Sequence, residues 1–327
     1  MKREEVPSVK VYFINPVNFI SVILNTLVEL EYETYVINDF DKLKLLKILE
    51  NDIRNVIFLC ITKKSEVDRY LQYIDLVKSL ESTHILFGAF VYNNMEYPDK
   101  EKLLMNNVSV TPFSEVSSNT LNVFKTILKI FEAKGQRKHI CVKARGICDA
   151  FITLKGREKP LKIQVLELST TAFACEVTED YHDFFTIGEN YQEIFLSLRG
   201  IRAKTSGRLL GFSRDNRNMY LFKHTFLNVQ NSKMVFIDKI QKEVKQKLYT
   251  YIKACLKEDI TDKLNLVTEE SLAEIKSLAQ KIAAETEKAA GAEAVEIKRL
   301  RNEKKTSEVK KENPPENAEE VEELEEV

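Results

Sequence analysis

Two groups of basic side chains are the residues of this 327-residue chain best suited to chemistry. One group lies in and just after the segment QRKHICVK, and the other lies along residues 199–217. The members are Arg137, Lys138, Lys143 and Arg145 in the first group, and Arg199, Arg202, Lys204, Arg208, Arg214 and Arg217 in the second. Guanidinium groups bind phosphates and guanine edges through paired hydrogen bonds, so both stretches are candidates for binding an anion. The competing interpretation, which we favour, is a solvated surface whose cations form salt bridges.

Residues with the spacing of a catalytic or metal site are missing from the sequence. The five cysteines and four histidines are scattered, without the short spacings of zinc ligands or of a nucleophile beside its base. The first apolar run is followed by residues 15–17, Asn-Pro-Val, which offer no glycine for a dinucleotide-binding turn or a P-loop. We therefore expect no enzyme, no catalytic residue, no metal and no cofactor.

Charge and hydropathy limit where the protein acts. The formal net charge is −1, so no global field selects a nucleic acid or an acidic partner. There is no apolar run long enough to span a bilayer, and the N-terminal MKREEVPSVK has no apolar stretch of the secretory kind. An odd number of unpaired cysteines is typical of a reducing compartment. We expect a cytoplasmic protein with no membrane insertion.

The first half of the chain alternates between two periodicities. Short apolar runs rich in Val, Ile and Phe lie at 9–15, 34–38, 55–61, 84–91 and 108–111. Between them, apolar residues recur at helical spacing, for example Ile20, Ile23, Leu24 and Leu27. Continuous apolar strands separated by amphipathic helices predict a parallel sheet that is covered on both faces. The sequence thus predicts a doubly wound α/β domain with five strands and five helices, ending near residue 133.

The pattern changes after residue 134, where most of the glycines lie. Six strand-like segments follow one another without intervening helices, at 147–154, 161–168, 171–177, 193–200, 202–212 and 218–226. Such a series predicts a small antiparallel β-barrel of six strands. An apolar stripe at helical spacing then predicts a helix that packs on the barrel, with Ile237, Ile240, Val244, Leu248, Ile252 and Leu256 on one side.

The last part of the chain is highly charged. Residues 268–305 are rich in Ala, Glu and Lys and predict a helix, whereas the acidic run after Pro314 and Pro315 predicts disorder. We therefore expect three regions: an α/β domain over 1–133, a barrel with its packing helix over 134–262, and a charged helix with a disordered tail over 263–327.

The α/β region resembles the receiver domains of two-component signalling. A working receiver needs carboxylates after its first strand to hold magnesium and an aspartate at the end of its third strand to accept phosphate. It also needs a small hydroxyl residue after the fourth strand and a lysine before a proline after the fifth. The corresponding residues here are Asn15, Cys60-Ile61-Thr62, Gly88-Ala89 and Thr111-Pro112-Phe113. The resemblance implies a receiver-like interaction module without the phosphorylation site.

The region 135–258 resembles the PilZ domain, a bacterial receptor module for cyclic di-GMP. That family has two arginines separated by three residues before its first strand and an Asp/Asn-x-Ser-x-x-Gly motif on a later strand. In QRKHICVK and VLELSTTAFACEV, Arg137 matches the first arginine and Ser169 matches the serine. Cys141 replaces the second arginine, Glu167 replaces the Asp or Asn, and Ala172 replaces the glycine.

The resemblance implies a non-enzymatic bacterial regulatory protein or adaptor, near cyclic di-GMP signalling and motility, that acts through protein partners. It also implies that dinucleotide binding is weak or lost. The degenerate site then comprises Arg137, Lys138, Cys141, Lys143, Arg145, Glu167, Ser169, Ala172, Arg202 and Arg208. Two alternatives stay open: an active cyclic di-GMP receptor with a relocated basic site, and a nucleic-acid binder that uses the 199–217 hairpin. That hairpin lacks interleaved aromatic residues for base stacking, so nucleic acid is the weaker alternative.

Overall fold

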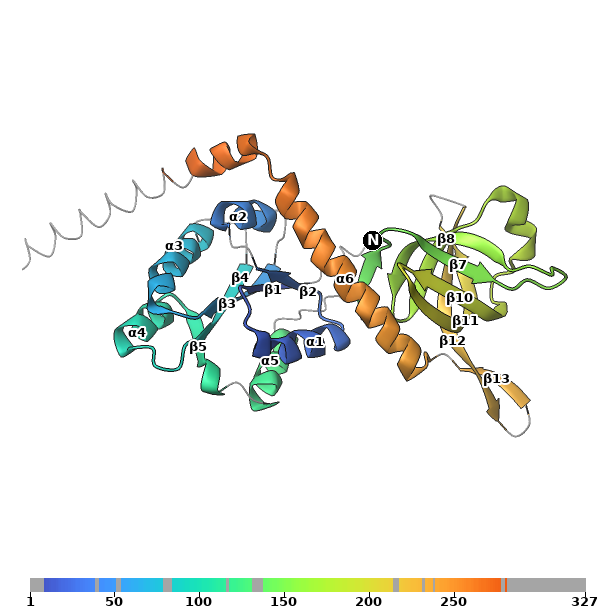
Figure 1. Ribbon diagram of the computed structural model, residues 1–327, viewed down its shortest axis with the longest axis horizontal. Coiled ribbons are helices and arrows are strands. Elements are labelled where there is room, and N and C mark those ends of the chain that lie inside the picture. The colour runs from blue at the N-terminus through green and yellow to red at the C-terminus, as the bar shows by residue number, and fades with distance from the viewer. Residues whose placement is uncertain are drawn as a thin grey trace, which may run out of the picture. The chain divides into compact units, whose positions relative to one another are not determined.

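The computed structural model divides the chain into two units, Met1–Leu272 and Ala273–Val327. It describes residues 9–38, 41–50, 54–78, 84–115, 118–130, 138–213, 218–230, 233–237, 239–277 and 280. The first unit contains a parallel sheet, a β-barrel and a long helix, α6 (Figure 1). Of the predicted C-terminal helix, residues 269–277 are helical, while the predicted acidic tail lies outside the described residues.

The first sheet has five parallel strands in the order β2-β1-β3-β4-β5. The strands are β1 (Lys10–Ile14), β2 (Thr34–Ile37), β3 (Arg54–Ile61), β4 (His84–Val91) and β5 (Val108–Pro112). This order, in which the chain crosses from one side of β1 to the other, is that of a doubly wound sheet. The five predicted strands are therefore confirmed.

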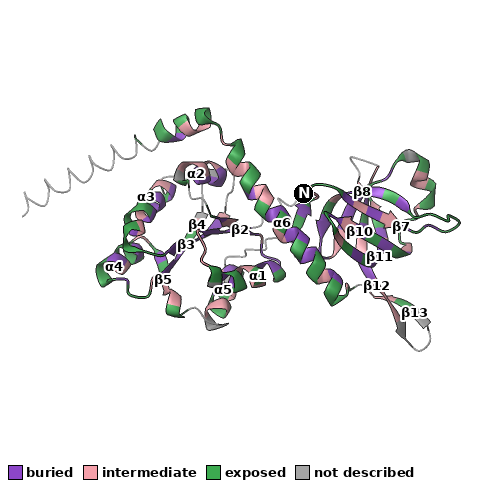
Figure 2. Ribbon diagram, viewed as in Figure 1, coloured by how far each residue is buried: buried purple, intermediate pink, exposed green. Residues whose placement is uncertain are grey.

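Five helices connect and follow these strands: α1 (Ser21–Glu29), α2 (Lys42–Glu50), α3 (Val67–Lys78), α4 (Tyr97–Met105) and α5 (Ser118–Ile130). In Figure 1, α1 and α5 lie together on one side of the sheet, and α2, α3 and α4 lie on the other. Alternate strand residues supply the two cores (Figure 2). Phe13, Phe58 and Phe90 pack with Phe124 of α5, whereas Tyr70 and Tyr73 of α3 are buried on the opposite side.

The barrel is a ring of six antiparallel strands, β7-β8-β9-β12-β11-β10, closed because β10 pairs with β7. Its strands are β7 (Cys148–Ile152), β8 (Leu161–Ser169), β9 (Ala172–Glu176), β10 (Asn190–Leu198), β11 (Ile201–Phe212) and β12 (Met219–Gln230). Each corresponds to one of the six predicted strands. The two-residue turn between β10 and β11 has positive φ at both Arg199 (52°) and Gly200 (86°), the backbone of a tight hairpin turn.

The structure adds elements that the apolar pattern did not predict. Two short strands, β6 (Cys141–Lys143) and β13 (Lys233–Ile237), flank the barrel and pair with β8 and β12. A 3-10 helix, Glu179–Phe184, lies between β9 and β10. The prediction that Ile237 begins the helical stripe was wrong, because Ile237 pairs with Phe226 at the end of β13.

Helix α6 (Lys242–Leu266) packs on more than the barrel. Its buried residues include Val244, Leu248, Ile252 and Leu256, as the predicted stripe requires. It contacts barrel strands β6, β8 and β11, and also β2, α1 and α2 of the α/β region. Both regions therefore pack against the same helix. None of the described helices is long and apolar enough to cross a bilayer.

Candidate functional site

The two motif segments lie next to each other in the barrel. β6 pairs with the end of β8, with Cys141 opposite Ser169 and Lys143 opposite Glu167. The Cys141 thiol donates to the Glu167 carboxylate, with 3.7 Å between Sγ and Oε2. Cys141, Lys143 and Glu167 are exposed, so they form part of the outer surface of the barrel. We call Cys141, Lys143, Glu167, Ser169 and Ala172 the motif strip.

The Ser169 hydroxyl closes the turn between β8 and β9. It accepts hydrogen bonds from the backbone N–H groups of Thr171 (3.2 Å) and Ala172 (2.9 Å). Ala172 is the first residue of β9 and is not among the described residues with positive φ. Alanine therefore carries no left-handed strain at this position, and its methyl group matters only for how closely a ligand could approach. The serine of the motif retains a structural role in this turn.

Arg145 is bound to α6. Its guanidinium pairs with Asp259 (Nη2–Oδ1 3.2 Å) and with Asp262, and the bond to Asp262 raises the pKa of Arg145. Its backbone N–H donates to the Tyr251 hydroxyl at 2.8 Å. Arg199 likewise pairs with Glu258 of α6. These two arginines form ion pairs that connect the barrel to α6. Their positive charge is therefore already matched by acidic partners.

The remaining basic candidates are dispersed. Arg202 and Arg208 lie on β11, which in the ring is adjacent to neither β6 nor β8. Arg208 donates to Asn190 (Nε–Oδ1 3.3 Å), and Lys204 pairs with Glu193 at 2.7 Å. Lys138 is exposed shortly before β6. Arg137, Arg214 and Arg217 lie outside the described residues. The fold therefore brings Cys141, Lys143, Glu167, Ser169 and Ala172 together but not Arg145, Arg202 or Arg208.

Glu31 is a buried carboxylate between the two regions that was not predicted from the sequence. Glu31 follows α1 in the α/β region, and its side chain accepts three hydrogen bonds from the C-terminal half of the chain. The donors are the Ile140 backbone N–H (3.0 Å), the Thr170 hydroxyl (2.6 Å) and the Tyr249 hydroxyl (2.8 Å). Ile140 and Thr170 are the neighbours of Cys141 and Ser169. Glu31 therefore holds the two segments that carry the motif.

Two further groups complete the surroundings of Glu31. The Nδ1 atom of His139 lies 3.5 Å from Oε1 of Glu31. The Tyr249 hydroxyl shares its one hydrogen between Glu31 and the backbone carbonyl of Glu29, which also lies 2.8 Å away. Burial, followed by the bond to Glu31, raises the pKa of Tyr249. We call Glu31, His139, Ile140, Thr170 and Tyr249 the Glu31 junction. The three donors satisfy the buried Glu31 carboxylate, as a buried charge requires, whereas the Nδ1 atom of His139 makes no hydrogen bond.

A local signal for Glu31 exists in hindsight. Its φ of 67° lies in the left-handed region, which glycine and asparagine adopt more readily than glutamate. A carboxylate is also unfavourable beside the carboxyl end of a helix. A glutamate at such a position indicates that its partners lie elsewhere in the fold. The sequence could not place the helix end accurately enough to reveal this conflict.

The carboxyl edge of the parallel sheet, meaning the residues at or just after the ends of β1, β3, β4 and β5, has neutral side chains at the receiver-like positions. Asn15 donates to the Tyr70 hydroxyl at 3.1 Å, and Thr62 donates to Glu66 of the following turn. Burial raises the pKa of the Cys60 thiol to about 12. β4 extends over His84–Val91, as the predicted strand 84–91 requires. Gly88 and Ala89 therefore lie within the strand and not at the position after it to which the receiver resemblance assigns them. Among the described residues, no group of His, Cys, Asp or Glu could hold a metal ion.

Known structures are similar to part of this chain. The Bacillus subtilis inhibitor of motility MotI/DgrA aligns at 11% identity over 38% of this chain and 52% of its own, with a TM-score of 0.27. YcgR from Escherichia coli in complex with c-di-GMP aligns at 16% identity over 41% and 51%, with a TM-score of 0.30. The c-di-GMP-bound PilZ domain of YcgR aligns at 15% identity over 40% of this chain and 99% of that domain, with a TM-score of 0.30.

This chain thus covers about half the length of the first two proteins. TM-scores of this size do not by themselves establish a shared fold. No protein-family model matches the chain, and a search of curated proteins finds no relative.

Proposed function

We propose that this protein is a non-enzymatic signalling adaptor with a degenerate PilZ-like barrel, acting by protein contacts in or near cyclic di-GMP signalling. The observation that carries the proposal is the register of β6 on β8, which puts Cys141 opposite Ser169 and Lys143 opposite Glu167. Two sequence segments chosen for their resemblance to a two-part motif are therefore neighbours in space. The closed six-stranded barrel is the frame that this resemblance implies.

The residues of the motif strip support weak or lost dinucleotide binding. An arginine at position 141 would offer a charged, forked donor to phosphate or to a guanine edge. The Cys141 thiol offers neither and already donates to Glu167. Losing a charge-assisted hydrogen bond costs about 1.5–3 kcal/mol, a ten- to hundredfold loss of affinity. Arg145 is matched by Asp259 and Asp262, so it is a poor substitute.

The Glu31 junction supports action through protein contacts. It joins the segments beside the motif to the α/β region by hydrogen bonds to a buried carboxylate. The α/β region, with neutral groups at its carboxyl edge, then serves as a receiver-like interaction module that needs no phosphorylation.

Calorimetry with cyclic di-GMP on the full chain tests this proposal at physiological salt. The wild type is expected to bind at least tenfold more weakly than the double variant Cys141→Arg/Ala172→Gly, because the variant restores one charged fork and one close backbone approach. Gln164→Arg is the matched control, since it adds the same charge at an exposed position of β8 outside the motif strip. Low-micromolar binding by the wild type would contradict the proposal and make the protein a true receptor.

A further inference from the structure

The barrel carries a two-stranded arm that extends beyond its wall. The last residues of β12 that pair with β11 and β9 are Thr225 and Lys223. From Phe226 onward, among the described residues, β12 pairs with β13 alone. We call residues 226–230 and 233–237 the hairpin arm, which projects from the other barrel strands in Figure 1. A two-stranded hairpin by itself is at best marginally stable in water, so a further strand would stabilise the arm.

The outer edge of β13 is open backbone. Among the described strands, β13 pairs with β12 and with no other. Along such an edge, alternate residues present N–H and C=O groups in a row that another extended chain can pair. A proline or a β-bulge commonly protects an edge from this pairing. The ladder from Gln230 and Lys233 to Phe226 and Ile237 has no bulge, and the strand KMVFI has no proline.

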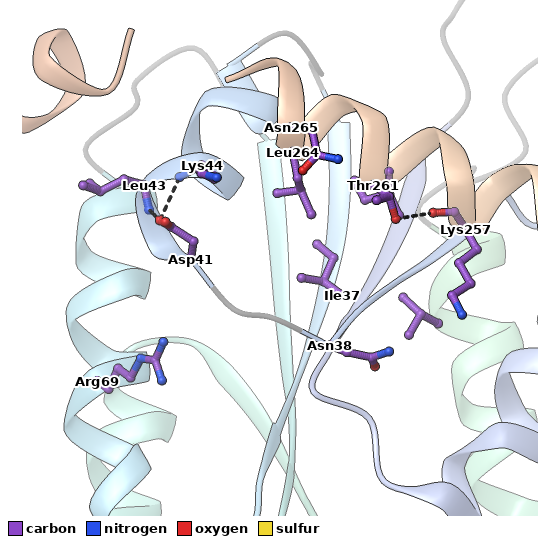
Figure 3. Close-up of a pocket in the computed structure, with 12 residues that line it drawn as sticks. Ile37, Asn38, Asp41, Leu43, Lys44, Arg69, Lys257, Thr261, Leu264 and Asn265 are labelled. Atoms are coloured by element: carbon purple, nitrogen blue, oxygen red, sulfur yellow. Dashed lines mark hydrogen bonds between the residues drawn. The ribbon is translucent and has the colours of Figure 1, made fainter. Parts of the chain in front are cut away.

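The two edges of the parallel sheet, by contrast, are protected. α6 packs beside β2, and Ile37 of β2 and Leu264 of α6 lie on facing sides in Figure 3. β5, the opposite edge strand, ends with Pro112, which has no N–H to donate. A covering helix and a proline are both means by which proteins prevent strand pairing. β13 contacts chiefly β12, so its outer edge has neither protection.

The residues of β13 are complementary to a second copy of the same strand. Antiparallel pairing about Val235 sets this exposed residue opposite its own copy, and Met234 opposite Phe236 of the copy. All three residues are apolar, which favours cross-strand pairs. The strand begins with Lys233, and Asp238 follows its last residue in the sequence, so opposite charges meet at both ends of the pair. A parallel pair would set like charges side by side, which is unfavourable.

We propose that the hairpin arm joins two copies of this protein, by antiparallel pairing of β13 with β13 of the second copy. The two arms then form a four-stranded sheet with a twofold axis at Val235. The assembly ends at a dimer, because the pairing uses the one outer edge of each β13. A five-residue strand buries less than the roughly 800 Å² per partner of a standard interface, so the dimer should be weak. The inference goes beyond the proposed function, and the motif strip has no part in it.

Sedimentation equilibrium of the full chain over a wide range of protein concentration tests the proposal. The wild type is expected to change from monomer to dimer as the concentration rises. Val235→Lys should weaken dimerisation about tenfold or more, because two lysines would lie opposite each other on the axis. Val123→Lys is the matched control, since it adds the same charge at an exposed position of α5. Circular dichroism and the melting temperature show that each variant is folded.

A mixing experiment gives a result that a folding defect cannot imitate. Val235→Glu alone should stay monomeric like Val235→Lys, whereas an equal mixture of the two variants should associate, because opposite charges then meet on the axis. Three results would each overturn the inference: a wild type that is monomeric at every concentration, a dimer that survives Val235→Lys, and a mixture of folded variants that does not associate. Binding of cyclic di-GMP does not involve Val235, so this inference and the proposed function can fail separately.

Discussion

The carboxyl edge of the parallel sheet and the motif strip of the barrel both lack groups that their resemblances imply, but the polar residues at the two places are bonded differently. At the carboxyl edge, the residues are neutral and bond to partners within the α/β region, as Asn15 does with Tyr70 and Thr62 with Glu66. Beside the motif strip, Ile140 and Thr170 bond to Glu31, more than a hundred residues away in the chain. The polar groups at the carboxyl edge are bonded within the α/β region, whereas those beside the motif strip connect two regions.

Removing the Glu31 carboxylate should change the stability of the protein more than any other substitution considered for these two places. Glu31→Ala leaves the Ile140 N–H and the Thr170 hydroxyl without their buried acceptor, and we expect it to lower the free energy of unfolding by about 3–5 kcal/mol. Urea denaturation followed by circular dichroism measures this, and the single transition expected for the wild type should separate into two.

The control for that experiment is Glu29→Ala. Glu29 lies two residues earlier, and its exposed side chain makes a long ion pair with Lys253 at 3.8 Å. Surface pairs of this kind contribute about 0–1 kcal/mol. If the Glu31 and Glu29 variants have the same free energy of unfolding, the connection between the α/β region and the barrel does not depend on the Glu31 carboxylate. The difference drawn above between the motif strip and the carboxyl edge would then be wrong.

A fall in pH should lower the stability of the barrel, next to the motif strip, more than that of the α/β region with its carboxyl edge. His224 is buried, and its backbone N–H donates to the carbonyl of Thr171 at 2.8 Å. Burial lowers the pKa of the His224 ring to about 4, because the charged ring loses its water. The backbone of Ser169 opposes this shift only in part. Neither ring nitrogen of His224 makes a hydrogen bond of normal geometry. Because the unfolded chain takes up this proton near pH 6.5, stability is present above that pH and is lost progressively as the pH falls towards 4.

The free energy lost through His224 over that range should be on the order of 3 kcal/mol. His224→Phe should remove this part of the pH dependence, while His182→Gln, at a half-buried position elsewhere, should keep it. Melting temperatures measured from pH 7.5 to 4.5 provide the comparison. Identical slopes for the wild type and His224→Phe would show that the ring is hydrated or protonated in the folded protein.

The smallest expected effect is at the carboxyl edge, where a small-molecule phosphodonor should produce no change at all. No aspartate stands at the end of β3, and a Cys60 thiol with a pKa of about 12 is not a nucleophile at neutral pH. Intact-mass measurement after incubation with acetyl phosphate checks this. A mass increase of one phosphate that hydroxylamine removes would show that the edge still carries receiver chemistry.

The sequence by itself determined the elements of this protein, because side-chain periodicity is a local property. The apolar runs from 9–15 to 108–111 became five parallel strands, and the six segments from 147–154 to 218–226 became the barrel. The short strand β6 was missed, since three residues are too few to show alternation. The start of the helical stripe was wrongly placed at Ile237, the last residue of β13, because a short apolar run can belong to either a strand or a helix.

Only the tertiary structure decided which charged groups meet. Arg145 and Arg199 were grouped in sequence with other cations, yet the fold pairs them with Asp259, Asp262 and Glu258 of α6. Glu31 had no visible partner in the sequence, because its donors Ile140, Thr170 and Tyr249 come from three distant segments. Ion pairs and buried hydrogen bonds depend on distances across the fold, and those distances exist only once α6 has packed against both the barrel and the sheet.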